Sequence, residues 1–113
     1  METLKKNYEF KKVLSKGKIV KGNFIDVYYI KKRYKQNRVG FAIQKKLGNS
    51  VARNHVKRIL RESYRFFEEQ IIDCFDMVFV WKKNVPLEEV SFHKINQDME
   101  TIFLNSLFVK EEK

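Results

Sequence analysis

Residues 45–65 read KKLGNSVARNHVKRILRESYR and carry seven basic side chains and one acidic side chain. At about 100° per residue, Arg53, Lys57 and Arg61 follow one side of a helix. The same arc of roughly 140° also contains Asn54, Arg58 and Arg65. The opposite arc contains Ala52, Val56, Ile59, Leu60, Ser63, Phe66 and Phe67. The segment therefore predicts an amphipathic helix with one core face and one cationic face.

The cationic face could be an ordinary solvated surface, which is the usual outer side of an amphipathic helix. Such surfaces normally mix charge signs, whereas here Glu62 lies only at the edge of the arc. Like charges cost stability, and a planar guanidinium can hold a phosphate through two hydrogen bonds. Asn54 adds a neutral donor and acceptor suited to a sugar, a base edge or a phosphate oxygen. We therefore favour a phosphate-binding face.

The residues before this helix predict its start. Gly48 allows a turn, and Asn49 or Ser50 is a good N-cap. Backbone N–H groups at a helix start also attract phosphate, although capping is the simpler role for these two side chains.

The whole-chain composition agrees with a nucleic-acid partner. The 113 residues carry 24 Lys plus Arg against 14 Asp plus Glu, a formal net charge of +10. A hydrophobic share of 43% is enough for one core, so residues 1–113 are expected to form a single RNA-binding domain. The sequence shows no apolar run long enough for a membrane span and no secretory signal, which predicts a cytoplasmic protein. One Cys and two distant His residues predict neither a disulfide nor a zinc site.

Other periodicities predict the remaining elements. Asn7 can cap a short helix that carries Phe10, Val13 and Leu14 and ends at a left-handed Gly17. Residues 24–30 alternate as a strand, 18–21 form a possible short strand, 31–37 form a turn, and 39–44 form a strand with one small face. Residues 76–81 form another strand, and a last helix begins at Pro86. The fold class is thus α+β, a small mixed sheet of about four strands with three helices in the order α-β-β-β-α-β-α.

One face of this sheet is expected to be partly open. Gly40, Ala42 and Gln44 would share it with Tyr28, leaving room for an unpaired base to stack on the aromatic ring. Phe10 and Leu14 of the first helix could line this groove, although apolar helix residues more often pack in a core.

Several of these segments resemble one family. The stretch GNSVARNHVKRILRE, residues 48–62, is similar to the arginine-rich signature of the bacterial ribonuclease P protein component. The segments FKKV at 10–13 with Gly17, and RVG at 38–40 leading to Lys45 and Lys46, also resemble that family. The likeness spans most of the chain.

The resemblance implies a subunit of a ribonucleoprotein endonuclease that removes the 5′ leader of precursor tRNA. It implies that the RNA subunit is catalytic, that the protein has no catalytic residue, and that Mg²⁺ is held mainly by the RNA. The expected partners are ribonuclease P RNA and precursor tRNA, with one protein monomer per RNA and no membrane. A left-handed crossover from the strand at Val39 to the strand at Asp76 is also implied.

The resemblance also assigns the candidate sites. Phe10, Leu14 and Tyr28 are the expected leader-binding residues. The expected contacts to the catalytic RNA are Lys45, Lys46, Asn49, Arg53, Asn54, Lys57, Arg58, Arg61 and Arg65. His55 and Leu14 depart from the family pattern, in which the first position is usually arginine and the second is often aromatic.

No carboxylate cluster suggests a protein nuclease site, since Asp26, Asp73, Asp76 and Asp98 are dispersed along the chain. Two other classes remain open: a basic ribosomal or RNA-chaperone protein without a role in cleavage, and a helix-turn-helix DNA-binding protein. The second of these would require two helices joined by a short turn.

Overall fold

The computed structural model describes residues 1–33, 36–72 and 74–104, in which five strands form one mixed sheet. The sheet order is β1-β4-β5-β3-β2, with β1 and β5 parallel to β4, β3 antiparallel to β5, and β2 antiparallel to β3. The strands are β1 (Glu2–Thr3), β2 (Lys18–Lys21), β3 (Ile25–Lys31), β4 (Arg38–Ala42) and β5 (Phe75–Trp81). The helices are α1 (Asn7–Lys16), α2 (Ser50–Phe67) and α3 (Phe92–Leu104), with short 3-10 turns η1 (Lys45–Leu47), η2 (Glu68–Gln70) and η3 (Leu87–Glu89).

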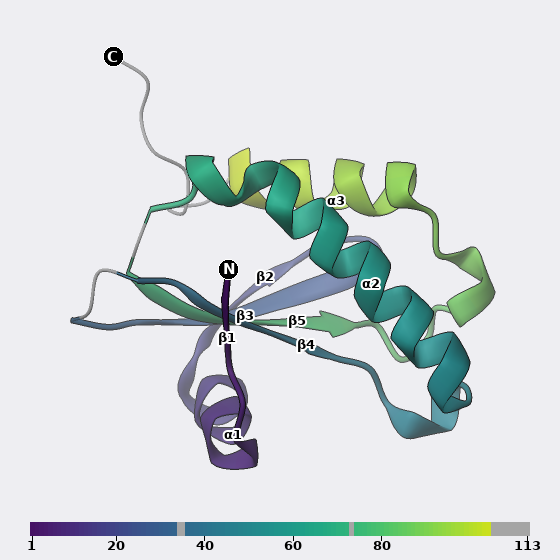
Figure 1. The fold of residues 1–113 in the computed structure, drawn as a ribbon, viewed down its shortest axis with the longest axis horizontal. Coiled ribbons are helices and arrows are strands. Elements are labelled where there is room, and N and C mark those ends of the chain that lie inside the picture. Colours follow the sequence, from purple (N-terminus) through teal and green to yellow (C-terminus); the bar gives the residue numbers. More distant parts are fainter. Residues whose placement is uncertain (34–35, 73, 105–113) are drawn as a thin grey trace.

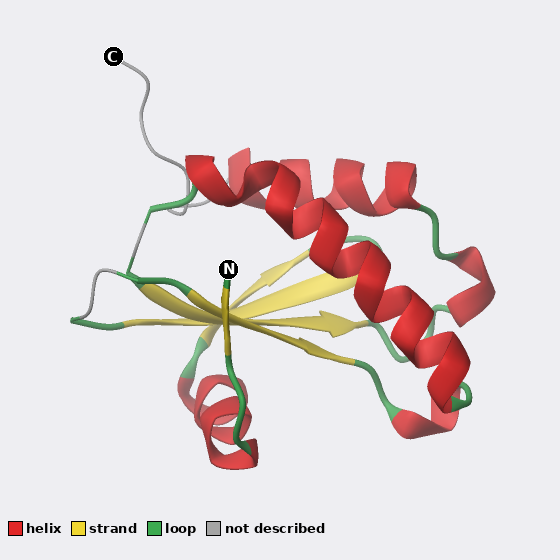
Figure 2. Ribbon diagram, in the orientation of Figure 1, coloured by secondary structure: helices red, strands yellow, loops and turns green. Residues whose placement is uncertain are grey.

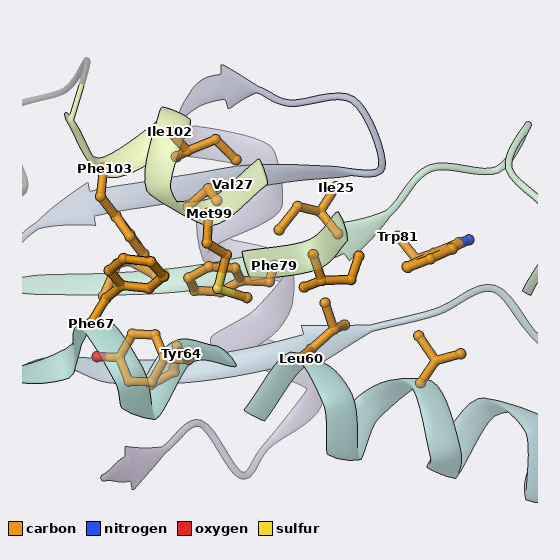
Figure 3. Close-up of a cluster of buried hydrophobic side chains, with 14 of the residues drawn as sticks. Ile25, Val27, Leu60, Tyr64, Phe67, Phe79, Trp81, Met99, Ile102 and Phe103 are labelled. Carbon is orange, nitrogen blue, oxygen red and sulfur yellow. The ribbon is translucent and has the colours of Figure 1, made fainter. Parts of the chain in front are cut away.

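The helices cover the two faces of the sheet unequally. Helices α2 and α3 lie together on one face, and α1 lies alone on the other (Figures 1 and 2). The larger core fills the space between the sheet and α2 with α3, where Phe79 and Trp81 of β5 are fully buried (Figure 3). A smaller apolar cluster, which includes Leu4, Val13 and Val78, lies under α1. The α+β class is confirmed, with five strands rather than about four.

Alternation along the strands follows the expected pattern. Ile25 and Val27 of β3 are buried in the larger core, whereas Tyr28 and Ile30 pack against the cluster under α1. This division places the side chain of Tyr28 on the same face as α1, as the period of two predicts.

Helix α2 confirms the amphipathic prediction with one exception. Val56, Leu60, Tyr64 and Phe67 are buried, and the Asn49 side chain caps the helix by accepting a hydrogen bond from the Ala52 N–H at 2.8 Å. Phe66, predicted for the core face, is 65% exposed and lies edge-on to Phe67. Phe66 lies about 100° around the helix from Phe67, outside the part of the α2 surface that the sheet and α3 cover.

The connection from β4 through α2 to β5 is left-handed. In Figure 1 both strands run toward the right, β4 lies nearer the viewer than β5, and α2 returns above the sheet. The chain therefore turns anticlockwise while moving away from the viewer. This is the rare hand for a parallel connection, and it matches the crossover that the resemblance implied.

Three local predictions were wrong, and one strand was missed. The first helix begins at Asn7, so Lys6 is its N-cap, and Gly17 follows it in an extended conformation with φ −76° rather than a left-handed one. Pro86 precedes only η3, and the last helix starts at Phe92, where the Ser91 hydroxyl accepts from the Lys94 N–H at 3.1 Å. Strand β1 was missed because two residues show no alternation.

Two predictions involve residues outside the described ranges. The turn predicted over 31–37 includes 34–35, and Asp73 is also outside them.

One carboxylate fixes α3 to the β2–β3 hairpin. Buried Asp98 accepts hydrogen bonds from the backbone N–H groups of Asn23, Phe24 and Ile25 at 2.7, 2.9 and 3.1 Å. Three donors that the turn leaves unpaired are thereby satisfied, so α3 is held against the end of β3.

Candidate functional site

The basic face of α2, defined by Arg53, Asn54, Lys57, Arg58, Arg61 and Arg65, lies on the side of the helix turned away from α3. The opposite side faces α3, because Ser63 donates a hydrogen bond to Asn96 of that helix at 2.8 Å. One edge of the basic face is half-buried and consists of Arg53, Lys57 and Arg61. The rest of the face is exposed and consists of Asn54, Arg58 and Arg65. The aliphatic stems of the half-buried residues pack on the protein while their charges stay accessible.

Within the part of the chain that the structure describes, almost none of this charge is neutralised. Among the described residues, Arg58 is the one cation of the basic face with a carboxylate within 4.0 Å, that of Glu62 at 3.9 Å. Both side chains are more than half exposed, so this pair contributes little. Arg53 donates from Nε to the Gly48 carbonyl at 3.1 Å, which orients its guanidinium and leaves its terminal nitrogens available.

The turn before α2 extends the basic face. Lys45 and Lys46 are exposed in η1, and exposed Asn49 uses its side-chain oxygen to cap the helix. His55, which departs from the family pattern, is exposed, and its Nδ1 lies 3.3 Å from Nη2 of Arg58. Its side chain therefore adjoins the basic face without belonging to its centre.

A groove lies on the other face of the sheet, beside α1. Strand register places Gly40, Val78 and Tyr28 in one row and Ala42, Val80 and Asp26 in the next. The Phe10 ring covers the first row, since a Cβ built on Gly40 would lie 2.6 Å from its Cζ atom. The second row is left uncovered and forms the floor of the groove.

Two adjoining cavities of about 360 and 330 Å³ make up this groove. Both are lined by Tyr28, Gln44 and Val80. The first also contains Leu14, which is 37% exposed, with Ala42 and Ile43. The second continues to Asp26, Trp81, Lys82, Lys83 and Asn84. Leu14 and Tyr28 thus line one groove, whereas Phe10 packs beneath its closed end.

Arg38 fixes α1 against the sheet and so sets one wall of the groove. Its guanidinium donates to Asp76 at 2.8 and 3.0 Å and to the Glu9 carboxylate, while Lys32 donates to Asp76 at 2.7 Å. Burial raises the pKa of Asp76, but the hydrogen bonds and charges of Arg38 and Lys32 outweigh it, so the pKa lies below its ordinary value. The hydrogen bonds to Asp76 in turn raise the pKa of Arg38.

Glu9 completes this link at the start of α1. The backbone N–H groups of Lys6 and Lys5 donate to its carboxylate at 2.9 and 3.0 Å, which lowers the pKa of Glu9, and Arg38 adds to the effect. The carboxylate therefore caps the helix and holds Arg38 at once.

Comparison with known proteins identifies the family. A family model for ribonuclease P matches residues 1–106. The chain is 40% identical over 111 residues to the ribonuclease P protein component of a Thermoanaerobacter species, covering 97% of this chain and 94% of the relative. The chain belongs to the ribonuclease P protein family. Membership makes it part of the endoribonuclease that matures the 5′ end of tRNA.

Further relatives are similar in sequence and in fold. The ribonuclease P protein component of Fusobacterium nucleatum is 33% identical over 111 residues, covering 96% of this chain and 100% of the relative. The Staphylococcus aureus ribonuclease P protein structure aligns with a TM-score of 0.83 at 25% identity, covering 97% and 99% of the two chains. The Thermotoga maritima structure aligns with a TM-score of 0.79 at 25% identity, covering 89% and 94%. The resemblance drawn from residues 48–62 is confirmed.

The geometry adds residues that the sequence alone did not single out for a ribonuclease P protein. Asp26, Lys82, Lys83 and Asn84 end the groove. Five exposed lysines also surround α1, at positions 5, 6, 11, 12 and 16. The Lys82-Lys83 pair was the available signal, but nothing in one sequence places that pair in the same groove as Tyr28.

The described residues gather no set of side chains for a metal ion. No three His, Cys, Asp or Glu residues in these ranges lie close enough together to share one. No helix in the described ranges has the length and apolar character needed to cross a membrane.

Proposed function

We propose that this chain joins two RNAs within ribonuclease P, using the basic face of α2 for the catalytic RNA and the groove beside α1 for the 5′ leader of precursor tRNA. The observation that carries the proposal is the position of these two surfaces on opposite faces of one sheet (Figure 1). Each surface can then hold its own RNA without competing for the other.

The contacts to the catalytic RNA are assigned to the basic face together with Lys45, Lys46 and Asn49. Arginines at 53, 58, 61 and 65 can each hold a phosphate through paired N–H donors, and Lys57 adds charge at the centre of the face. Asn54 can bond to a sugar or a base edge. The scarcity of nearby carboxylates supports this assignment, because an unbalanced cationic face gains stability when phosphates cover it.

The leader is assigned to the groove because its floor suits an unpaired base. Tyr28 offers a ring for stacking, Leu14 gives an apolar wall, and the small Ala42 leaves space beside them. Phe10 supports the groove from beneath by fixing the distance between α1 and β4. Double-stranded RNA would be too broad to bring its bases onto this floor.

In this mechanism the protein contributes charge and position rather than a reacting group. Two RNAs repel each other, and a protein with a net charge of +10 lowers that repulsion when it lies between them. The cleavage step is assigned to the RNA subunit, with Mg²⁺ held mainly by that RNA. One protein monomer per catalytic RNA, acting in the cytoplasm, completes the proposal.

The test is cleavage of precursor tRNA by the catalytic RNA at low Mg²⁺ concentration, with and without the protein. We expect the protein to raise the rate, and we expect K57Q/R61Q to weaken this gain by weakening RNA binding. Y28A should reduce the gain for a precursor with a long leader but not for one with a single-nucleotide leader. K94Q, which removes a cation from α3, serves as the charge control.

The competing proposal is a basic RNA-binding or RNA-chaperone protein with no role in cleavage. That function predicts RNA binding by the wild-type protein without any gain in cleavage at low Mg²⁺. This result would refute the proposed function.

A further inference from the structure

The first turn of α1 carries an aromatic side chain that packs in neither apolar core. Tyr8 is 67% exposed, although it lies only two residues from Phe10, whose ring packs on Gly40. Among the described residues, Tyr8 makes no hydrogen bond and no contact with another aromatic ring. A single exposed aromatic side chain is common on protein surfaces, so its meaning depends on the residues around it.

Two lysines flank Tyr8 on the outer side of α1. Lys11 lies about 60° to one side of it around the helix and Lys12 about 40° to the other, with Cβ atoms roughly 5–6 Å away. Both lysines are exposed, and among the described residues neither forms an ion pair. Glu9, the single acidic residue of α1, is held by Arg38 and by backbone N–H groups. We call the surface formed by Tyr8, Lys11 and Lys12 the crest of α1.

The crest has the composition that suits single-stranded RNA. Bases of any identity stack on an exposed ring, and neighbouring cations hold the phosphates on either side. Val13 lies about 140° around the helix from Tyr8 and is buried under α1, so the crest is turned away from the sheet. A base can therefore reach the Tyr8 ring without displacing a packed side chain.

The crest adjoins the groove and is separated from the basic face of α2. Lys11 lies about 60° around the helix from Tyr8 and about 60° from Leu14, which lines the groove. A strand that leaves the groove over Leu14 therefore meets Lys11 and then Tyr8. Helix α1 lies on the opposite side of the sheet from α2 (Figures 1 and 2). The RNA within reach of the crest is thus the one in the groove rather than the one on the basic face.

Gln44 indicates which part of the leader passes over α1. It lines both cavities of the groove and directly precedes Lys45 and Lys46, which are assigned to the catalytic RNA. The leader nucleotides next to the cleavage site are therefore expected on the Gln44 side of the groove. The nucleotides further upstream then leave the groove on the side of α1.

We propose that the crest of α1 is a second binding site for the leader, where Tyr8 stacks on an unpaired base upstream of the nucleotide that contacts Tyr28. Lys11 and Lys12 pair with the phosphates of this upstream segment. The inference rests on the proposed leader-binding function of the groove. It lengthens the bound part of the leader without requiring a particular base, because stacking tolerates any sequence.

The experiment uses the reconstituted holoenzyme and precursor tRNAs whose leaders grow by one nucleotide at a time. The measured quantity is the Kd for each precursor, under conditions in which cleavage is slow. We expect Y8A to raise the Kd about five- to tenfold for leaders long enough to reach the crest, in the range for one lost stacking contact. Shorter leaders should bind as to wild type. The effect of Y28A should begin at a shorter leader than that of Y8A.

Matched variants separate stacking from other effects. Y8F keeps the ring and should bind every precursor as wild type does. F66A removes a ring of similar exposure, 65%, from α2, so any change in its Kd should be the same at all leader lengths. K12Q should make the salt dependence of long-leader binding shallower by about 0.7 in the logarithmic slope. Thermal melting checks that Y8A folds, as expected for alanine at an exposed helix position.

Several results would overturn the inference while leaving the proposed function intact. Y8A could bind as wild type does at every leader length, or lose the same factor at every length. Y8F could lose as much as Y8A, which would exclude stacking. The loss in Y8A could also begin at a shorter leader than the loss in Y28A. If the wild-type protein stimulates cleavage of no precursor, the proposed function itself is refuted, and this inference with it.

Discussion

At the scale of single residues, the contact between Gly40 and Phe10 determines how closely α1 approaches the sheet. The ring occupies the space where any other residue would place its Cβ, so Gly40 is required for close packing rather than for backbone freedom. Phe10 thereby closes one end of the groove and leaves the row of Ala42, Val80 and Asp26 open.

We predict that G40A destabilises the protein by about 1 to 3 kcal/mol, because the added methyl group displaces the Phe10 ring from a packed position. Urea unfolding measures the effect. G48A is the matched control: its Cβ would lie 2.8 Å from Cδ1 of Leu87, the end of a flexible side chain, so a much smaller loss is expected. Equal losses in the two variants would contradict the account.

For single residues, the sequence predicted which way a side chain points from its helix or strand. It did not predict how far the buried face extends around the helix. The helix wheel placed Arg53, Lys57 and Arg61 together and Leu60 in the core, because these depend on the helical period alone. It failed for Phe66, because the width of the buried face depends on where α3 lies. The strand period of two placed Asp26 on the face of Tyr28, but its place in the groove also depends on its neighbours on β5.

At the scale of elements, the ion pairs of Arg38 connect α1, β4 and β5. Glu9 comes from α1, Asp76 from β5, and Lys32 from the residue after β3. The charges balance only when these elements are packed together, so the cluster stabilises the arrangement that forms the groove.

This cluster predicts a dependence of stability on pH. The folded protein lowers the pKa of Asp76 below its ordinary value of 3.8, so the stabilisation is fully present above that pH and is lost as the pH falls further, through the lower pKa of the folded protein. At pH 7 we expect D76N to be less stable than wild type by about 1 to 2 kcal/mol, below the figure for fully buried pairs because solvent screens this one. The difference should shrink as the pH falls below about 4.

Urea unfolding of both proteins across the acid range measures this difference. E100Q, at an exposed carboxylate of α3, should follow the wild-type curve in shape. If the difference in free energy of unfolding between D76N and wild type stayed constant with pH, the ionised carboxylate of Asp76 would be excluded as the source of that difference.

The sequence predicted most elements but not their unusual features. Strands at Ile25–Lys31 and Phe75–Trp81 were expected from β-branched and aromatic residues. The false helix start at Pro86 arose because proline suits the first turn of a 3-10 helix as well as that of an α-helix. The left-handed crossover was expected from the resemblance alone, because no local pattern encodes the hand of a long connection.

At the scale of the whole molecule, the sheet separates two surfaces of different character. Helix α2, which carries the basic face, lies above one side of the sheet, and α1, which borders the groove, lies on the other (Figure 1). Phe79 and Trp81 of β5 fill the core between the sheet and the paired helices (Figure 3). This core lies between the two surfaces and keeps their side chains apart.

We therefore predict that substitutions on the two surfaces act independently. R61Q should weaken binding of the protein to the catalytic RNA, and Y28A should weaken binding of precursor tRNA, so both losses enter the free energy of assembling protein, catalytic RNA and precursor tRNA. The free-energy losses should sum in the double variant to within about 0.5 kcal/mol, as for distant sites without shared partners. Equilibrium binding of both RNAs to the four proteins completes the cycle, and a coupling of several times that size would show that the surfaces communicate.

The position of β5 has a consequence for how the chain folds during synthesis. β5 is the central strand of the sheet, yet it is the last strand to leave the ribosome. Until residue 81 emerges, β3 and β4 have no strand between them, and their apolar residues await a distant pairing partner. Chains dominated by such pairings fold slowly and are prone to aggregate while incomplete. The many lysines of the first 46 residues give the nascent chain a charge that opposes self-association during this interval.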